Sequence, residues 1–381
     1  MKIAHISMFY YPTFGGVEKV IEELALRQIK EGHEVHVFCS DSDKYKRIRP
    51  LNEIVNNIHI HRHRYWLRLS LFTFIWPTLL FSRTLWFNDF DVFHSHVSGH
   101  LYNLIAGIIA KLKGIRFVHT THCPWTESFR PLSVRIPLLF TNLIFNRIAF
   151  KLMDKIIAIT PWELPTLKKW IKDESKIIVL PNGMDKVFFT KVKDNDFRKK
   201  FKIPEKEKLV LFFGRYNITK GPEKLILAAK EILKERKDIT FLFVGPDEGM
   251  LNQMLELAKG ENKIIIQGPI RDRKEVVKMY QSSDVFVLPS FREGLPLCLF
   301  EAFASGLPVV ASPVNGVPYE MEDNVNGIFV NYGDIERLKN SILKILDDKK
   351  LTLKFSKNNT EKSKKYDWDI IYKKYMEIYS N

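Results

Sequence analysis

The chain has 381 residues, of which 45% are apolar and 27% charged, so it is too long for one compact core and too apolar for a disordered protein. Its three cysteines, Cys39, Cys123 and Cys298, are scattered and lack metal-ligand spacing, which argues against a disulfide framework or structural zinc and fits a reducing cytosol. The net charge of +15 suits a nucleic acid, an anionic membrane or a phosphate-rich ligand, but no nucleic-acid-binding module is recognisable.

The N-terminal half alternates short apolar runs with amphipathic helical spacing, as βαβ units in parallel sheets do. Residues 1–7 are too brief and wrongly flanked for a signal peptide, so they are expected to begin a first strand. In 16–31, Val17, Val20 and Leu24 share a helical face that can pack on a sheet. Strands are expected at 3–8, 34–39, 57–62, 92–94, 117–121, 156–160 and 177–180.

Residues 44–83 carry a local excess of positive charge, because their eight basic residues are opposed by Glu53 alone. They include the most apolar segment of the chain, 69–82, whose 14 residues fall short of the roughly 18 to 20 that span a bilayer. This segment suits either an interfacial element attracted to anionic lipid or a buried helix pair. With a second basic, acid-free apolar stretch at 129–151, it favours peripheral docking on the cytoplasmic face of a membrane.

A second series of strands and helices follows a charged stretch at 186–208, which has little to bury and is expected to link two domains. The domains are placed at 1–187 and 188–365. An amphipathic segment at 366–381 is expected to return and pack on the first domain. A helix is expected at 222–236. Strands are expected at 209–213, 241–244, 264–267, 285–288, 308–311 and 327–330.

Two glutamates flank the start of a predicted helix in the second half. Glu293 precedes the helix and Glu301 lies two turns into it. A helix N-terminus offers backbone amides and partial positive charge to a diphosphate, and a glycine lets the backbone approach closely. The two carboxylates can accept hydrogen bonds from sugar and ribose hydroxyls. The residues of the turn expected to face the donor are Gly294, Leu295, Pro296 and Leu297.

This block resembles the E-x₇-E signature of glycosyltransferase family 4, the retaining, glycogen-synthase-like group 1 glycosyltransferases of the GT-B fold. Residues 214–221 also follow a predicted strand and match the family's G-R-x₄-K-G segment. A leaving nucleoside diphosphate gains negative charge, which a guanidinium and an ammonium can stabilise without a metal. The resemblance implies this role for Arg215 and Lys220, and donor binding for Glu293 and Glu301.

Three segments of the first half fit the same resemblance. Gly15 and Gly16 lie where family members have a glycine-rich loop near the donor. His122, at the end of a predicted strand, matches a histidine that faces the transferred sugar in similar proteins, whereas His119 is expected to point elsewhere. Residues 181–185 resemble the architectural P-N-G-x-D turn. The absence of G-x-G-x-x-G from the sequence counts against a dinucleotide dehydrogenase.

The resemblance covers nearly the whole chain and implies an α/β protein of the GT-B class, with two Rossmann-like domains whose parallel sheets face each other across a deep cleft. It implies retaining transfer of a hexose-type sugar from a UDP- or GDP-sugar to a glycan or lipid-linked acceptor near a membrane. The implied catalytic residues are His122, Arg215, Lys220 and Glu293.

Metal dependence has a separate signature, the Asp-x-Asp triplet that holds a divalent cation in another glycosyltransferase architecture. Such triplets occur at 41–43, 194–196 and 367–369, in scattered contexts that indicate chance. Neither a metal nor another cofactor is therefore expected.

Two alternatives stay open. A sugar-nucleotide epimerase of the same shape would bind the same donor, but it needs a general acid and base near the anomeric carbon and releases nucleotide without an acceptor. A non-catalytic basic protein that binds a membrane or a nucleic acid would also fit the charge. No nucleic-acid partner is expected, because the basic residues interleave with aliphatic runs rather than with stacking platforms.

Overall fold

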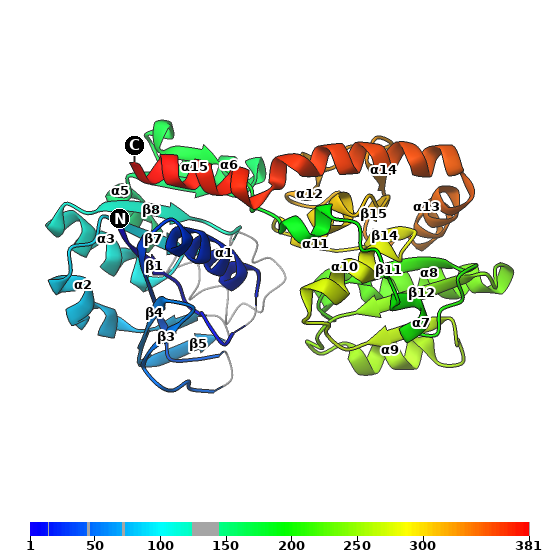
Figure 1. Ribbon diagram of the computed structural model, residues 1–381, viewed down its shortest axis with the longest axis horizontal. Coiled ribbons are helices and arrows are strands. Elements are labelled where there is room, and N and C mark those ends of the chain that lie inside the picture. The colour runs from blue at the N-terminus through cyan, green and yellow to red at the C-terminus, as the bar shows by residue number, and fades with distance from the viewer. Residues whose placement is uncertain (14, 44–45, 71–72, 124–144, 381) are drawn as a thin grey trace. The chain divides into compact units, whose positions relative to one another are not determined.

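The computed structural model divides the chain into two compact units, each with its own sheet (Figure 1). The described residues are 1–13, 15–43, 46–70, 73–123 and 145–380. Unit 1 comprises Met1–Gly183 and Asp369–Asn381, and unit 2 comprises Met184–Trp368. The divisions expected from the sequence were at 187/188 and 365/366.

The sheet of unit 1 has eight strands. They are β1 (Lys2–Ile6), β2 (Glu34–Ser40), β3 (Asn52–Val55), β4 (Ile58–His63), β7 (Val92–His96), β8 (Arg116–Thr120), β9 (Lys155–Ala158) and β10 (Ile177–Val179). Their order is β10-β9-β8-β7-β1-β2-β4-β3, and every neighbouring pair is parallel except β3 with β4. Strands covered on both faces are apolar along their length, which is why all but the edge strand β3 were predicted from apolar runs.

Helices cover the two faces of this sheet. They are α1 (Gly16–Lys30), α2 (Arg83–Phe87), α3 (Leu101–Lys113), α5 (Arg147–Leu152), α6 (Leu164–Trp170) and α15 (Trp368–Ser380), with short 3₁₀ turns η3 (Pro161–Glu163) and η4 (Glu174–Lys176). Ile21 of α1 packs with Val37 of β2, and Ile105 of α3 packs in a separate core with Phe93 and Phe117. The apolar stripe predicted for 16–31 therefore lies on the buried face of α1, with Val20 and Leu24 buried.

The interpretation of residues 69–82 as a buried helix pair is wrong. Strands β5 (Leu67–Ser70) and β6 (Thr73–Ile75) form an antiparallel hairpin, followed by the 3₁₀ helix η1 (Pro77–Phe81). Short apolar runs do not distinguish helix from strand, and the Thr, Phe and Ile residues here favour strand until Pro77 opens a helical turn. Among the described helices, none combines the length and hydropathy that a membrane span requires.

Unit 2 contains a six-stranded, fully parallel sheet. Its strands are β11 (Lys208–Phe213), β12 (Ile239–Val244), β13 (Ile264–Gln267), β14 (Val285–Leu288), β15 (Val309–Ala311) and β16 (Gly327–Phe329). The order is β13-β12-β11-β14-β15-β16. All six strands were predicted from apolar runs.

The helices of unit 2 connect these parallel strands. They are α7 (Phe197–Lys200), α8 (Pro222–Glu235), α9 (Leu251–Ala258), α10 (Arg273–Gln281), α11 (Leu297–Ala304), α12 (Val317–Glu320), α13 (Ile335–Asp347) and α14 (Lys349–Ser363), with turns η5 (Lys186–Phe189), η6 (Ile218–Lys220) and η7 (Lys364–Tyr366). The chain leaves β11 first toward β12 and later returns to β14 on the other side. Ligands of open α/β sheets bind at such a switch point, outside the carboxyl ends of the strands.

Candidate functional site

The loops after β11 and β14 are joined at the switch point of unit 2. The carbonyl oxygen of Thr219 accepts hydrogen bonds from the backbone amides of Phe291 and Arg292, at 2.9 and 3.2 Å. Gly221 has a positive φ of 62°, and a Cβ there would lie 2.2 Å from the carbonyl oxygen of Pro289. Only glycine fits this close approach, which brings the end of η6 against the loop after β14.

Lys220 and Glu293 form an ion pair across these two loops. The Lys220 Nζ lies 2.5 Å from the Glu293 Oε2, and the Ser290 hydroxyl donates to the Glu293 Oε1 at 2.7 Å. The backbone amide of Glu293 donates to the Asn315 Oδ1 at 3.2 Å. With its side chain 3% exposed, the carboxylate is held in one orientation by charge-assisted hydrogen bonds.

Arg215 pairs with a different acid. Its Nη1 lies 2.8 and 3.1 Å from the two carboxylate oxygens of Glu248, which comes from the loop after β12. Asn217 donates to the same carboxylate at 3.2 Å. The Arg215 side chain is 45% exposed, so its remaining N–H groups are accessible to a ligand. The sequence reasoning missed Glu248, although it follows a predicted strand and lies at the same sheet edge.

The turn before α11 is the segment whose backbone was predicted to face the diphosphate. Leu295 and Pro296 are buried, Gly294 and Leu297 are half-buried, and Pro296 occupies the N-cap of α11 without a side-chain capping bond. Neither a side-chain cap nor an acidic residue in the first turn therefore competes with an anion for the helix N-terminus.

Glu301 lies inside α11 and is 5% exposed. Its Oε1 accepts a hydrogen bond from the Arg273 Nη1 at 2.9 Å, and its Oε2 accepts one from the Tyr280 hydroxyl at 3.0 Å. Both partners come from α10 and were missed from sequence, since nothing in their spacing links them to α11. The two glutamates of the E-x₇-E block thus have separate partners, Lys220 for one and Arg273 for the other.

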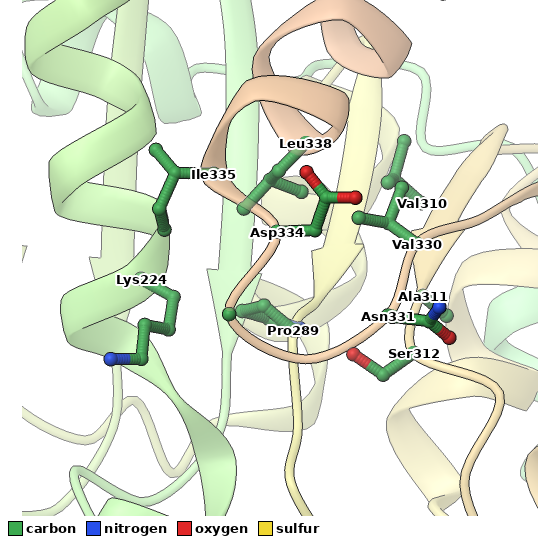
Figure 2. A pocket seen from close by; sticks show the side chains of 11 residues that line it. Lys224, Pro289, Val310, Ala311, Ser312, Val330, Asn331, Asp334, Ile335 and Leu338 are labelled. Carbon is green, nitrogen blue, oxygen red and sulfur yellow. The ribbon is translucent and has the colours of Figure 1, made fainter.

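A small hollow opens at the carboxyl ends of β14, β15 and β16. Figure 2 shows Lys224 of α8 on one side and Val330 and Asn331 after β16 on the other, with Pro289 and Asp334 between them. The space enclosed inside it is about 10 Å³, far below the roughly 300 to 1,000 Å³ of ligand pockets. We therefore do not assign the donor to this hollow.

In unit 1, Gly15 and Gly16 lie at the turn from β1 to α1, as predicted. Gly15 is the N-cap of α1, and its extended backbone is open to any residue. A Cβ on Gly15 would lie 2.2 Å from the carboxylate of Glu18, whereas none of the atoms described lies within 4 Å of a Cβ on Gly16. Because glycine has no side chain, the N-terminus of α1 stays accessible at Gly16.

His122 follows β8 in a left-handed backbone conformation with φ of 56°. Its Nε2 is 3.2 Å from the His96 Nδ1, and burial lowers the pKa of His122 to about 3. His119 is fully buried and bonds instead with the hydroxyls of Ser95 and Ser98, at 2.7 and 2.8 Å. The two histidines therefore have separate surroundings.

Each Asp-x-Asp triplet contains an acid that is paired with a basic side chain. The pairs are Asp41 with Arg47 at 2.7 Å, Asp196 with Lys278 at 2.6 Å and Asp369 with Arg27 at 3.4 Å. Two other groups in the described part of the chain have the ligand types and spacing that a metal ion needs. They are His5, His94 and His96, and Glu34, His36 and His59.

Two family profiles match the chain, one in each unit. Residues 14–187 match the profile described as Glycosyltransferase Family 4, and residues 193–362 match Glycosyl transferases group 1.

Characterised relatives resemble the chain over nearly its full length. The UDP-Gal:alpha-D-GlcNAc-diphosphoundecaprenol alpha-1,3-galactosyltransferase of Escherichia coli is 27% identical, over 94% of this chain and 91% of its own. The D-inositol 3-phosphate glycosyltransferase of Corynebacterium efficiens is 25% identical, over 100% of this chain and 95% of its own.

Solved structures share the fold at low sequence identity. Sucrose-phosphate synthase from Thermosynechococcus elongatus superposes with a TM-score of 0.79 at 22% identity, covering 100% of this chain and 98% of that one. Anabaena HepE in complex with UDP gives a TM-score of 0.77 at 19% identity, covering both chains completely. These likenesses confirm the predicted GT-B class.

Proposed function

Because this chain belongs to the group 1 glycosyltransferases of the GT-B fold, we propose that it transfers a hexose-type sugar from UDP or GDP, with retention of configuration and without a metal, to a lipid-linked acceptor near a membrane. The observation that carries the proposal is the Lys220–Glu293 ion pair, held between the loops after β11 and β14. This pair lies at the sheet position where α/β proteins bind nucleotides.

The chemistry follows from the charges on these loops. When the glycosidic bond breaks, negative charge develops on the departing diphosphate, and preorganised cations lower the barrier most because they need no rearrangement. Lys220 is fixed by Glu293 and keeps N–H directions for a phosphate, and Arg215 is fixed by Glu248 in the same way. The N-terminus of α11 adds backbone amides.

The proposal of metal independence rests on the cations at this site and on the ion pairs of the Asp-x-Asp triplets. In metal-dependent transfer, carboxylates hold a divalent cation on the donor phosphates. Here the acids that contact the proposed phosphate-binding cations, Glu293 and Glu248, are neutralised by Lys220 and Arg215. Lysine and arginine thus supply the positive charge that the metal supplies elsewhere.

A thermal-shift screen of nucleotide diphosphate sugars tests the donor and the metal together. At a concentration about 100 times Kd, the correct donor stabilises the protein by about 2.7 kcal/mol, or several degrees in the melting temperature. We expect one UDP- or GDP-sugar to give this shift equally with and without EDTA. The Lys220→Ala variant should lose it. A shift that disappears in EDTA and returns with a divalent cation would contradict metal independence.

The lipid-linked acceptor is supported by the name of the E. coli relative, whose acceptor is a diphosphoundecaprenol, and by the surface of unit 1. Helices η1, α2, α3 and α5 contain five basic residues and no acid. Large apolar side chains are exposed among them, including Phe81 at 71%, Phe87 at 80% and Leu112 at 70%. Lys113 of α3 donates hydrogen bonds to carbonyls at the end of α2, and α3 packs against η1 and α5.

We define this apolar and basic area as the docking face; it comprises Leu80, Phe81, Arg83, Phe87, Ile108, Lys111, Leu112, Arg147, Ile148 and Lys151. It overlaps the end of the predicted segment 44–83 and the described part of 129–151, of which 129–144 lies outside the described residues. Burial of aromatic side chains in the interface and attraction to anionic lipid can act together here.

Co-sedimentation with vesicles containing anionic lipid tests the docking face. Removing Phe81 and Phe87 together as Phe81→Ser/Phe87→Ser should weaken binding at least tenfold, since burying one such side chain is worth about 1.5 to 3 kcal/mol. Leu353→Ser, which removes an exposed leucine of unit 2 that is 61% exposed, is the matched control and should bind normally. Equal binding of both variants, or no wild-type binding at any salt concentration, would contradict docking through this face.

A further inference from the structure

A buried polar layer lies on one face of the sheet in unit 1. It contains His5 from β1, His94 and His96 from β7, Gln28 from α1 and Tyr379 from α15, each at most 3% exposed. Strands of parallel sheets are normally apolar on both faces, and buried polar groups are costly unless they are hydrogen-bonded. Each ring nitrogen in this layer therefore needs a hydrogen-bond partner.

Three of these residues form a hydrogen-bonded chain that ends at His122. The Gln28 Oε1 is 2.9 Å from the His5 Nε2, the His5 Nδ1 is 3.1 Å from the His96 Nε2, and the His96 Nδ1 is 3.2 Å from the His122 Nε2. Both nitrogens of His5 and of His96 are used. The chain of hydrogen bonds therefore connects α1 with the carboxyl end of β8 across one face of the sheet.

Burial keeps the rings of this chain uncharged. It lowers the pKa of His5 to about 4 and that of His122 to about 3, and it lowers the pKa of His96 well below the usual value. A neutral imidazole donates from one nitrogen and accepts at the other. The group at one end of the chain therefore sets the direction of every hydrogen bond along it.

In the structure the Gln28 amide turns its Oε1 toward His5, and a carbonyl oxygen only accepts. The proton of His5 is then on Nε2, and the His5 Nδ1 accepts from the Nε2 of His96. The His96 Nδ1 in turn accepts from the Nε2 of His122. This leaves the Nδ1 of His122 as a hydrogen-bond acceptor.

We propose that Gln28, His5 and His96 are positioning residues that hold His122 in the Nε2–H tautomer, so that its Nδ1 accepts a hydrogen bond from a hydroxyl of the transferred sugar. The part concerning the sugar rests on the proposed function, whereas the tautomer does not. In this way a glutamine on α1 determines which hydrogen-bonding role the strand-end histidine presents to the donor.

His94 belongs to a separate branch and supplies the control. Its Nδ1 is 2.6 Å from the Tyr379 hydroxyl and its Nε2 is 2.8 Å from the Thr120 hydroxyl. Tyr379→Phe therefore removes this buried hydrogen bond, and with it a hydroxyl that also interacts with the Gln28 side chain, while the links from the Gln28 Oε1 to His122 stay in place. A purely structural role of the layer predicts similar effects for Tyr379→Phe and for a Gln28 variant.

The tautomer can be read directly by magic-angle-spinning NMR of the full chain labelled with ¹³C,¹⁵N-histidine, with His122→Gln used to assign its signals. We expect protonation of His122 on Nε2 in the wild type and in Tyr379→Phe, and a mixture of tautomers in Gln28→Met. Protonation on Nδ1 in the wild type would overturn the proposal. An unchanged single tautomer in folded Gln28→Met would also overturn it.

Metal analysis and kinetics complete the test. A metal ion bound stoichiometrically by His5, His94 and His96 would take the lone pairs that the chain uses, so its presence in purified protein and loss in His5→Gln would overturn the proposal. In the transfer assay, Gln28→Met should lower kcat about tenfold, the loss of one oriented hydrogen bond, with unchanged affinity for the free nucleotide. Tyr379→Phe should keep kcat. Failure of transfer in the wild type would count against the proposed function and leave the tautomer result standing.

Discussion

Replacing Arg215 with alanine is expected to lower kcat by about 10² to 10³-fold while changing the free energy of unfolding by less than about 1 kcal/mol. The side chain is 45% exposed, and its ion pair with Glu248 is therefore worth little to stability. Its proposed contribution arises only as the diphosphate departs, so the loss should appear in kcat at saturating donor.

A matched control for Arg215 exists in the same unit. Arg236 pairs with Asp238 and Asp347 on the surface, with its side chain 29% exposed. Arg236→Ala removes the same charge and a comparable pair, so bulk charge effects would appear in both variants. We expect normal kcat for Arg236→Ala. Equal losses in the two variants would mean that Arg215 acts only through net charge.

Lys220→Ala should cause a similar loss of turnover but also destabilise unit 2. Lys220 is 16% exposed and Glu293 is 3% exposed, so the substitution leaves a buried carboxylate without its cation. Breaking a buried pair costs about 3 to 5 kcal/mol, and partial exposure reduces that figure here. The catalytic and structural effects therefore need to be separated.

The double variant Lys220→Ala/Glu293→Gln makes that separation. The amide removes the unpaired charge and can still accept from Ser290, so stability should recover. Turnover should stay low, because the ammonium is absent. Near-normal rates in both Arg215→Ala and Lys220→Ala would contradict the assignment of these cations to the leaving group.

The sequence predicted the parallel strands because burial on both faces makes them continuous apolar runs, and it predicted the β11 and β14 loops because glycines mark turns where two backbone segments approach closely. It missed Glu248, Arg273 and Tyr280, since their partners are 21 to 33 residues away and pair only after the sheet has formed. The hairpin at 67–75 was missed because a short apolar run has no diagnostic period.

The histidine layer shows a different limit. His94 and His96 alternate on one strand, which identifies a shared face, but the sequence does not indicate that β1 lies beside β7 or that Gln28 covers them. Strand order is a property of the whole chain, so the relay to His122 becomes visible only with the topology.

The strongest pH effect is expected in unit 1, which contains all eleven histidines of the chain. Six of them are buried. His36 is hydrogen-bonded to the Glu34 carboxylate, and the other five are His5, His94, His96, His100 and His119. Burial lowers the pKa of His5 and His100 to about 4 and of His119 to about 3, and it lowers the pKa values of His94 and His96 well below the usual value. Folding therefore excludes protons that the unfolded chain would bind.

This exclusion of protons determines whether the free energy of unfolding rises or falls with pH. Between about pH 6.5 and pH 4 the unfolded chain binds more protons than the folded one, so the free energy of unfolding falls as the pH falls. Each such histidine contributes about 1.4 kcal/mol per pH unit, and five contribute about 7 kcal/mol per pH unit. Against a typical stability of roughly 5 to 15 kcal/mol, unit 1 should unfold within about two pH units below 6.5.

Tryptophan fluorescence can follow this transition, because six of the seven tryptophans belong to unit 1 and only Trp368 to unit 2. Calorimetry from pH 8 to pH 5 should show that the melting temperature of unit 1 falls steeply, whereas that of unit 2 falls less.

His100 stacks on Tyr102, and its Nδ1 has no hydrogen-bond partner among the described residues, so His100→Phe removes one titrating ring at little packing cost. In this variant the free energy of unfolding should fall less steeply as the pH falls, by about 1.4 kcal/mol per pH unit. The reason is that unfolding then takes up four protons at these sites instead of five. Parallel shifts of both transitions would place the acid sensitivity outside the buried histidines.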